Sequence, residues 1–470
     1  MVVLRERCLA PTLAVLFGLL PRPAQQPAGR GFITFAEARS VVSAMHAALP
    51  AGLAGLEDDR VAATWPSWVR ERDRAVRERL ARGEEDAVVN LLFLGTSFTD
   101  APRLTAEVLG AGAGGTESLL ARRLEDLAAA LAGAGGDERV RLARAVFARS
   151  ANRAVPSRGA ALAWLRQMVA RVWQERRSFA AELARIRAIP DATEQMAERS
   201  TLFHDRGIAL DTSLRPAFAV EEALRDALRR GLIPARGVRR AAVVGPGLDF
   251  VDKTEGQDFY PPQSLQSAAL ADSLVRLGLA RAEALEVTAF DISPRVLDHL
   301  ARARARAVAG EGDVLQLPRP QSGWRGPFLA YWERFGDAVA TSAEAVRPPP
   351  SAGALEVRAV RLRPEVQARV RPVDLDIVYQ RLDLPEERRF DLVVATNILV
   401  YYDTFEQCLA FANVARMTAP GALLLSNNAI LELPGAALRS VGYKTVVFSD
   451  KPEDGEHVIF YRRLSDPAGR

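Results

Sequence analysis

Lysine is almost absent from this chain of 470 residues: Lys253, Lys444 and Lys451 stand against a large excess of arginine. The formal net charge is only +4, because 62 basic residues are balanced by 58 acidic ones. No basic stretch is interleaved with aromatic side chains on which bases stack, so we expect no nucleic-acid partner. The 49% hydrophobic and 26% charged composition is typical of a globular protein, and the length suits two or three domains.

Cysteine and histidine are equally scarce. The two cysteines, Cys8 and Cys408, provide neither a disulfide framework nor a cysteine cluster for a metal. The four histidines are scattered along the chain and show no metal-ligand spacing. We therefore expect no structural metal.

Long apolar runs are also missing, and the one near the N-terminus is short for a membrane span. Residues 1–27 begin with Arg5 and Arg7, continue through the apolar run 8–20 and end in a proline-rich break, which resembles a secretory signal. We expect an extracytoplasmic or membrane-associated protein, with membrane contact only through this segment if it stays uncleaved. The alternatives are a misassigned start codon or a frayed helix, and the protein would then be cytoplasmic.

Residues 31–200 show the apolar periodicity of helices and contain no catalytic constellation. We predict an all-α N-terminal domain here, followed by a second domain over residues 201–470. A polar loop, residues 203–213, precedes the second domain's first predicted strand. This loop either lines a ligand pocket or is a turn in which a polar side chain caps the next helix.

The apolar run 241–244 ends abruptly in Gly245, Pro246 and Gly247. Such a turn is typical of the first strand of an α/β nucleotide-binding fold, because glycine lets the backbone approach a ligand closely. On its own this signal is weak, since many strands end in two glycines.

The second predicted strand, 285–290, ends in Asp291. A carboxylate at that position can accept hydrogen bonds from both hydroxyl groups of a ribose. The other interpretation is that Asp291 or Ser293 caps the helix that begins near Pro294.

The remaining motifs complete an α/β pattern, although residues 308–353 look irregular because of their prolines. Inside that irregular insert, residues 328–335 form an aromatic amphipathic helix. Further strands are predicted at 355–362, 369–377 and 422–426, and residues 390–403 hold the fourth core strand and the loop after it. A helix is predicted at 406–417, and a final hairpin at 444–448 and 457–461.

This order of motifs resembles class I S-adenosylmethionine (SAM) methyltransferases over roughly residues 200–470. The matching motifs are the Gly245-Pro246-Gly247 loop, Asp291, the strand 390–393, the Pro420-Gly421 turn and the C-terminal hairpin. The resemblance implies an α/β Rossmann-like sheet that ends in an antiparallel hairpin, and SAM as cofactor. Residues 395–403 are also similar to a segment of chemotaxis-receptor glutamate methyltransferases, except that Thr396 stands where that family has arginine.

The resemblance also implies roles for individual residues. Gly245 and Gly247 would pass the methionine part of SAM, and Asp249 would hold its amino group. Asp291 would bind the ribose. The adenine would lie near Asp376, with Asp374 and Asp383 as rivals, while Asn397 and Tyr401 would face the methyl group and the acceptor. The alternative for the last pair is that Asn397 caps a turn and Tyr401 belongs to the core.

We interpret the chain as a SAM-dependent methyltransferase whose acceptor is a protein carboxylate or a small molecule. The first alternative is a catalytically silent SAM-fold module that binds a partner through its helical domain. The second is an NAD-dependent oxidoreductase, which is disfavoured because Asp249 and Phe250 follow where the dinucleotide fingerprint has its third glycine. The sequence leaves the oligomeric state open.

Overall fold

The computed structural model describes residues 29–465, except for 106–107, 109–115, 153–156, 192–193, 196–197, 200–201, 205, 251–256, 321–322 and 452–453. The signal-like segment 1–27 lies outside the described residues. Within the described part of the chain, no helix has both the length and the apolar character needed to cross a membrane.

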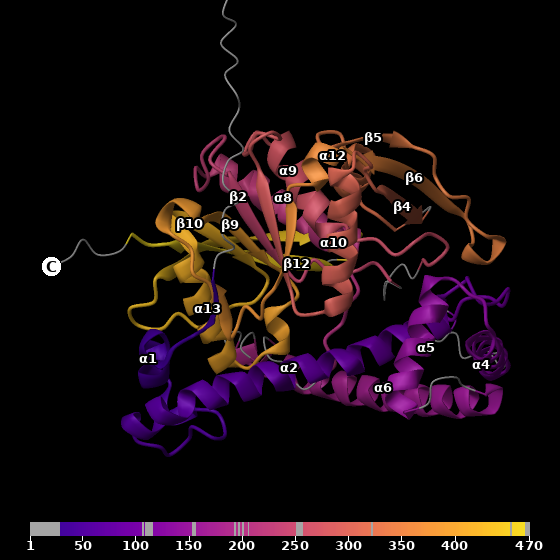
Figure 1. The fold of residues 1–470 in the computed structure, drawn as a ribbon, viewed down its shortest axis with the longest axis horizontal. Helices are drawn as coiled ribbons and strands as arrows, with labels where there is room; N and C mark the ends of the chain where they lie inside the picture. The colour runs from indigo at the N-terminus through magenta and orange to yellow at the C-terminus, as the bar shows by residue number, and fades with distance from the viewer. Residues whose placement is uncertain are drawn as a thin grey trace, which may run out of the picture.

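A seven-stranded sheet forms the centre of the molecule (Figure 1), with the strand order β11-β12-β10-β9-β2-β3-β7. The strands from β10 to β7 run parallel, whereas β12 is antiparallel to both of its neighbours. This confirms the predicted sheet and its C-terminal hairpin. The strands are β2 (Arg240–Val244), β3 (Glu286–Asp291), β7 (Val370–Asp374), β9 (Phe390–Ala395), β10 (Thr418–Ser426), β11 (Leu438–Val447) and β12 (Gly455–Arg463).

Both faces of the sheet are buried, as expected for parallel strands that are apolar at successive positions. In β2, Ala241 and Val243 point into one core, while Ala242 and Val244 point into the other. The first face is covered by α8 (Leu214–Arg229), α9 (Gln266–Arg276) and α10 (Pro294–Val308). The second is covered by α1 (Phe35–Ala44), the first half of α2 (Asp58–Leu94) and α13 (Thr404–Met417).

The N-terminal segment completes this second face. The connections 375–389 and 427–437, which follow β7 and β10, contain no α-helix, so α1 and α2 fill the space beside α13. The rings of Trp65 and Trp68 lie 6.5 and 5.9 Å from that of Phe405 on α13. The expectation of an all-helical segment was wrong at its start, because β1 (Arg30–Phe32) pairs antiparallel with β8 (Gln380–Leu382). The division near residue 200 stays a prediction.

A third core lies beyond the sheet, between the second half of α2 and three further helices, α4 (Thr116–Ala132), α5 (Glu138–Ala151) and α6 (Arg158–Arg187). Polar contacts attach it to the loop after β2. Arg139 on α5 is fully buried and donates to the carbonyl of Asp258 at 2.9 Å. The Asp258 carboxylate accepts from the backbone amides of Thr96 and Ser97 at 2.7 and 3.0 Å.

Residues 308–353 are more regular than we predicted. They contain β4 (Val314–Pro320), α11 (Gly326–Arg334) and β5 (Ala340–Ala343), and with β6 (Leu355–Leu362) the two strands form an antiparallel sheet in the order β4-β6-β5. The expectation of an irregular insert was wrong because prolines interrupt central strands but are tolerated on an edge strand such as β4. The aromatic helix is confirmed as α11.

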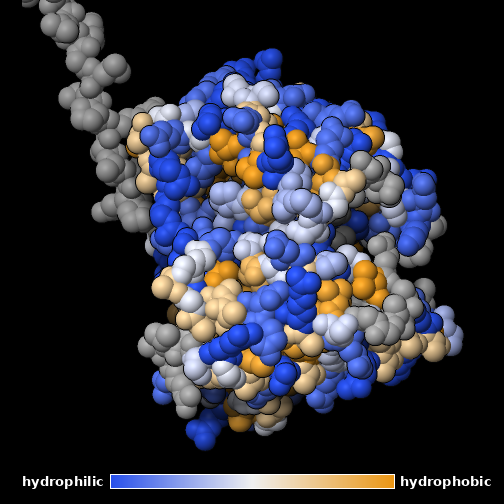
Figure 2. All heavy atoms as spheres, turned by 90° about the vertical axis from the view of Figure 1, so that its right-hand side faces the viewer, coloured by the Kyte–Doolittle hydropathy of each residue, from blue (hydrophilic) through white to orange (hydrophobic). Residues whose placement is uncertain are grey.

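Hydrophilic residues dominate the face of the molecule shown in Figure 2. Hydrophobic side chains occur on it in small separate groups rather than in one broad patch. Scattered apolar groups of this kind are normal on a protein surface and do not by themselves mark a binding site.

Candidate active site at the carboxyl edge of the sheet

A cavity of about 470 Å³ opens at the carboxyl edge of the parallel strands. Ligands of open α/β sheets bind in this position, where the loops after the strands converge. Its lining includes Gly245 and Gly247 after β2, Asp291 at the end of β3, Asp376 after β7, and Asn397 and Tyr401 after β9. The structure therefore brings together six of the seven residues that we singled out.

The glycine loop requires glycine at both positions. Gly245 and Gly247 have φ values of +65° and +66°, in a region that other residues rarely adopt. A Cβ atom on Gly247 would lie 2.8 Å from the carbonyl oxygen of Leu210, so the segment after residue 207 packs directly on the loop. The loop is held to the sheet by the Gly245 amide, which donates to the carbonyl of Phe290 at 2.8 Å.

Asp291 faces the cavity and also supports the turn into α10. One carboxylate oxygen, Oδ1, accepts from the Ser293 amide at 2.8 Å. Ser293 is the N-cap of α10. Burial raises the pKa of Asp291 to about 6, against the lowering effect of backbone amides that include that of Gly247. The ligand-binding and turn-supporting interpretations of this residue are therefore compatible.

Among the three candidate adenine-side carboxylates, only Asp376 lines the cavity. Its side chain is 1% exposed, Oδ1 accepts from the Val378 amide at 2.9 Å, and Oδ2 has no hydrogen-bond partner. Burial raises the pKa of Asp376 to about 7. Asp374 instead forms ion pairs with Arg30 and Arg77 at 3.1 and 2.8 Å, and Asp383 is paired with Arg381.

Asp249 does not line the cavity, contrary to the position we expected from the resemblance. Its Oδ2 accepts from the Tyr260 hydroxyl at 2.9 Å and from Gln263 Nε2 at 3.0 Å. The backbone of Asp249 also bridges to Gln263. These contacts hold the end of the loop that follows β2, because the chain turns away from the cavity immediately after Gly247.

Asn397 and Tyr401 both reach the cavity. Asn397 has φ +61°, its amide donates to Asn427 Oδ1 at 2.8 Å, and its Nδ2 donates to Glu456 Oε1 at 3.4 Å. The N-cap of the following 3₁₀ turn, η4 (Leu399–Tyr401), is Ile398, so Asn397 does not cap it. The Tyr401 hydroxyl accepts from the Ala209 amide at 3.3 Å.

The polar loop before α8 lines the cavity over residues 208–213. It is joined to the glycine loop, since the Leu248 amide donates to the carbonyl of Leu210 at 2.8 Å. Ser213 is the N-cap of α8 but makes no side-chain capping hydrogen bond. Of the two interpretations left open by the sequence, the structure thus favours the pocket-lining one.

Glu456 is a cavity residue that the sequence analysis missed, because the second strand of the predicted hairpin began at residue 457 and left Glu456 in the turn before it. It lies at the beginning of β12, which is antiparallel, so it returns to the same edge as the ends of the parallel strands. Burial raises the pKa of the Glu456 carboxyl, against lowering effects of the Asn397 hydrogen bond and the Arg215 charge. The antiparallel direction of this strand is the signal that would have located it.

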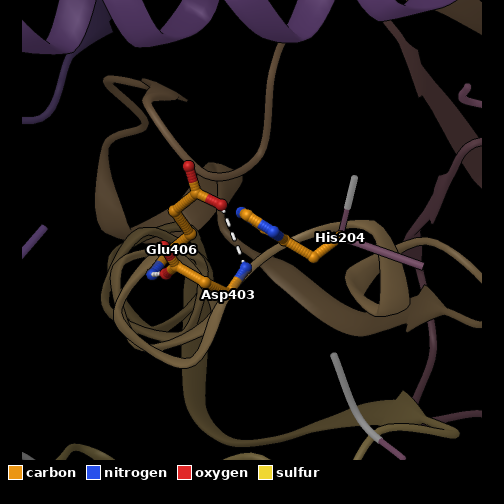
Figure 3. A group of neighbouring side chains, drawn as sticks. All are labelled: His204, Asp403 and Glu406. Carbon is orange, nitrogen blue, oxygen red and sulfur yellow. Dashed lines mark hydrogen bonds between the residues drawn. The ribbon is translucent and has the colours of Figure 1, made fainter. Parts of the chain in front are cut away.

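A second group of polar side chains, His204, Asp403 and Glu406, lies outside this cavity (Figure 3). Their potential ligand atoms are within 4.8 Å of one another. Asp403 and Glu406 form the capping box of α13: each carboxylate accepts from the other residue's backbone amide, at 2.8 and 3.0 Å. Glu406 also accepts from Arg72 at 2.7 Å, which ties α2 to α13. Helix capping and helix attachment therefore account for the two carboxylates of this group.

No protein-family model matches the chain, and no curated protein matches it. Among solved structures, it is similar to the glycopeptide N-methyltransferase MtfA complexed with SAM (16% identity, 55% of this chain and 70% of that chain, TM-score 0.21). It is also similar to the magnesium protoporphyrin IX methyltransferase ChlM from Synechocystis PCC 6803 (9% identity, 63% of this chain and 99% of that chain, TM-score 0.26). A third similar structure is the CcbJ methyltransferase from Streptomyces caelestis (17% identity, 54% of this chain and 79% of that chain, TM-score 0.21).

At these identities and TM-scores, the similarities assign neither a cofactor nor an acceptor to this chain, and the fold assignment rests on its own topology. Four parallel β pairs follow one another from β10 to β7, as in a dinucleotide-binding sheet. The antiparallel β12 lies between β10 and β11. A dinucleotide-binding sheet has no such antiparallel strand, whereas the sheet of methyltransferases does. By this strand arrangement the chain has the fold of the class I methyltransferases, as predicted.

Proposed function

We propose that the chain is a SAM-dependent methyltransferase. The observation that carries this proposal is the order of polar groups along the cavity. Because β7, β3, β2 and β9 are neighbours in the sheet, Asp376, Asp291, the glycine loop and Asn397 follow one another along its edge. This order matches the adenine, the ribose and the methionine part of extended SAM, and Asn397 would lie on the side of the methyl group that the SAM sulfur carries.

Three features of the cavity fit the cofactor. The free, buried Oδ2 of Asp376 is a hydrogen-bond acceptor that an adenine amino group would satisfy. Gly245 and Gly247 line the cavity with bare backbone, and an added Cβ would clash with Ile398 or with Leu210. Asp291 would accept from the ribose hydroxyls, while its other contact, to Ser293, holds the carboxylate in position.

SAM supplies a methyl group on a positively charged sulfur, which is already activated for transfer. The protein's contribution is therefore to align donor and acceptor and to exclude water. Asn397 and Tyr401 are suited to this task, because both reach the cavity and both side chains are held by hydrogen bonds. A catalytically silent module with the same fold would bind SAM equally well, so turnover has to be measured separately from binding.

The test is isothermal titration calorimetry of the purified protein with SAM, with its demethylated product S-adenosylhomocysteine (SAH), and with NAD as a control. We expect SAM and SAH to bind at one site and NAD not to bind. A protein that is folded but binds neither SAM nor SAH would contradict the proposal. A homocysteine-release assay on candidate acceptors then separates an enzyme from a silent module.

A further inference from the structure

Glu456 offers an unused acceptor inside the cavity. Its Oε1 accepts from Asn397 Nδ2 at 3.4 Å, but its Oε2 is buried and has no hydrogen-bond partner. A buried polar atom left without a hydrogen-bond partner is destabilising, because nothing compensates for the water it has lost. A ligand that donates a hydrogen bond to Glu456 would remove this cost.

The position of Glu456 assigns it to the acceptor end of the site. β12 lies beyond β9 and β10, on the side away from β7, so Glu456 and Asp376 lie toward opposite ends of the carboxyl edge. Asn397 and Asn427 are joined by reciprocal hydrogen bonds, at 2.8 and 2.5 Å, and this pair fixes the amide that contacts Glu456. The free carboxylate oxygen is thus held in place beyond the glycine loop.

The charge of the cavity distinguishes between classes of acceptor. Among the described lining residues five are acidic, and Arg215, on α8, is the one basic side chain. Arg215 is itself paired with Asp454 at 2.8 Å, in the turn before β12. Thr396, which also lines the cavity, carries no charge. An acceptor carboxylate would meet repulsion here, whereas a cation would be attracted.

We propose that the methyl acceptor is an amine, which Glu456 binds as an ammonium ion and from which it takes a proton. This inference rests on the proposed function. The proton moves from nitrogen to the Glu456 carboxylate, and the freed lone pair forms the bond to the methyl carbon. The carbon–sulfur bonding pair stays on sulfur, so that neutral SAH, a methylated ammonium ion and a protonated Glu456 result. Glu456 then releases its proton to solvent.

The experiment uses sinefungin, a SAM analogue in which a carbon replaces the sulfur and an amino group replaces the methyl group. Calorimetry at pH 7.5 compares sinefungin with uncharged SAH for the wild type, Glu456→Gln and Glu365→Gln. The glutamine keeps the hydrogen bond to Asn397 but has no negative charge. Glu365 is an exposed carboxylate on α12 (Pro364–Gln367), so its variant controls for the loss of one charge far from the cavity.

We expect the wild type and Glu365→Gln to prefer sinefungin over SAH to the same extent. In Glu456→Gln that preference should fall about tenfold or more, the scale of a hydrogen bond to a charged group, while SAH affinity stays unchanged. An unchanged preference in Glu456→Gln, with SAH still bound, would overturn the amine assignment alone. Failure of SAH to bind the wild type would instead overturn the proposed function.

Discussion

Gly245 and Ile398 approach so closely that a Cβ atom on the glycine would lie 2.0 Å from Ile398 Cδ1. Both residues line the cavity, so this contact joins the loop after β2 to the loop after β9. Ile398 can respond to a larger residue at position 245 only by moving its side chain. The displaced Ile398 side chain would then occupy part of the cavity proposed to bind SAM.

Gly245→Ala should therefore weaken SAM binding beyond what backbone strain explains. Gly278 is a matched control, because it has φ +70° and its added Cβ would meet no atom within 4 Å. Both alanine variants should lose about 1 kcal/mol of folding stability from the left-handed conformation. Calorimetry should show weaker SAM binding for Gly245→Ala but not for Gly278→Ala. In the double variant Gly245→Ala, Ile398→Ala the SAM affinity should partly recover. Equal SAM affinity in both single variants would contradict the contact's role.

Asp291→Asn should weaken SAM binding by about 1.5–3 kcal/mol, the scale for hydrogen bonds to a charged group. The asparagine oxygen can still accept from the Ser293 amide, so the turn into α10 should persist. Ser293→Ala, which removes only the α10 cap, serves as the control and should leave SAM affinity unchanged. If Asp291→Asn is folded and binds SAM normally, the ribose site lies elsewhere.

Asp376 should make the ligand-free protein less stable as the pH rises. Burial raises its pKa to about 7, well above the ordinary value of 3.8, so the folded state holds a proton that the unfolded state releases. The stability present below pH 3.8 is lost as the pH rises through 7, by up to roughly 4 kcal/mol. Asp291, whose burial raises its pKa to about 6, acts in the same direction.

The measurement is the melting temperature of the wild type and Asp376→Asn at pH 5 and pH 8. The asparagine has no proton to lose, so the variant should lose less stability than the wild type between these two values. If the melting temperatures of the wild type and Asp376→Asn change equally between pH 5 and pH 8, the pKa of Asp376 is not raised by burial.

If Asn397 and Tyr401 align donor and acceptor as proposed, replacing either should remove turnover while SAM still binds nearly normally, because their contribution would be made in the transition state. Asn397→Gly is preferable to Asn397→Ala, since glycine tolerates the observed φ of +61° without added strain. Tyr401→Phe removes the hydroxyl that contacts the Ala209 amide. The readouts are SAM calorimetry and homocysteine release with an identified acceptor. Full turnover in both variants would exclude these residues from the mechanism.

We propose that residues 1–27 act as an export signal, which predicts a mature protein beginning near residue 25. N-terminal sequencing of the protein from its native host tests this directly. An intact Met1 in a soluble cytoplasmic fraction would rule the signal out.

Local sequence determined the strands and their loops. The run 241–244 is apolar on both faces, and it can only be buried between two layers, so its sheet position was predictable. Gly245 and Gly247 were identifiable because the positive φ of the turn demands glycine. Asp291, Asn397 and Tyr401 were identifiable because each stands at the end of a predicted strand or in the turn that follows one. Ligands of α/β sheets bind at that edge.

Only the tertiary structure decided which polar side chains share the cavity. Asp374 and Asp376 are two residues apart, yet the first is held by Arg30 and Arg77 while the second is buried with a free oxygen. Glu456 comes 59 residues after Asn397 and contacts it because β12 runs back to the carboxyl edge. The covering of the second sheet face by α1 and α2 was equally hidden, because apolar periodicity shows that a helix face is buried but not what buries it.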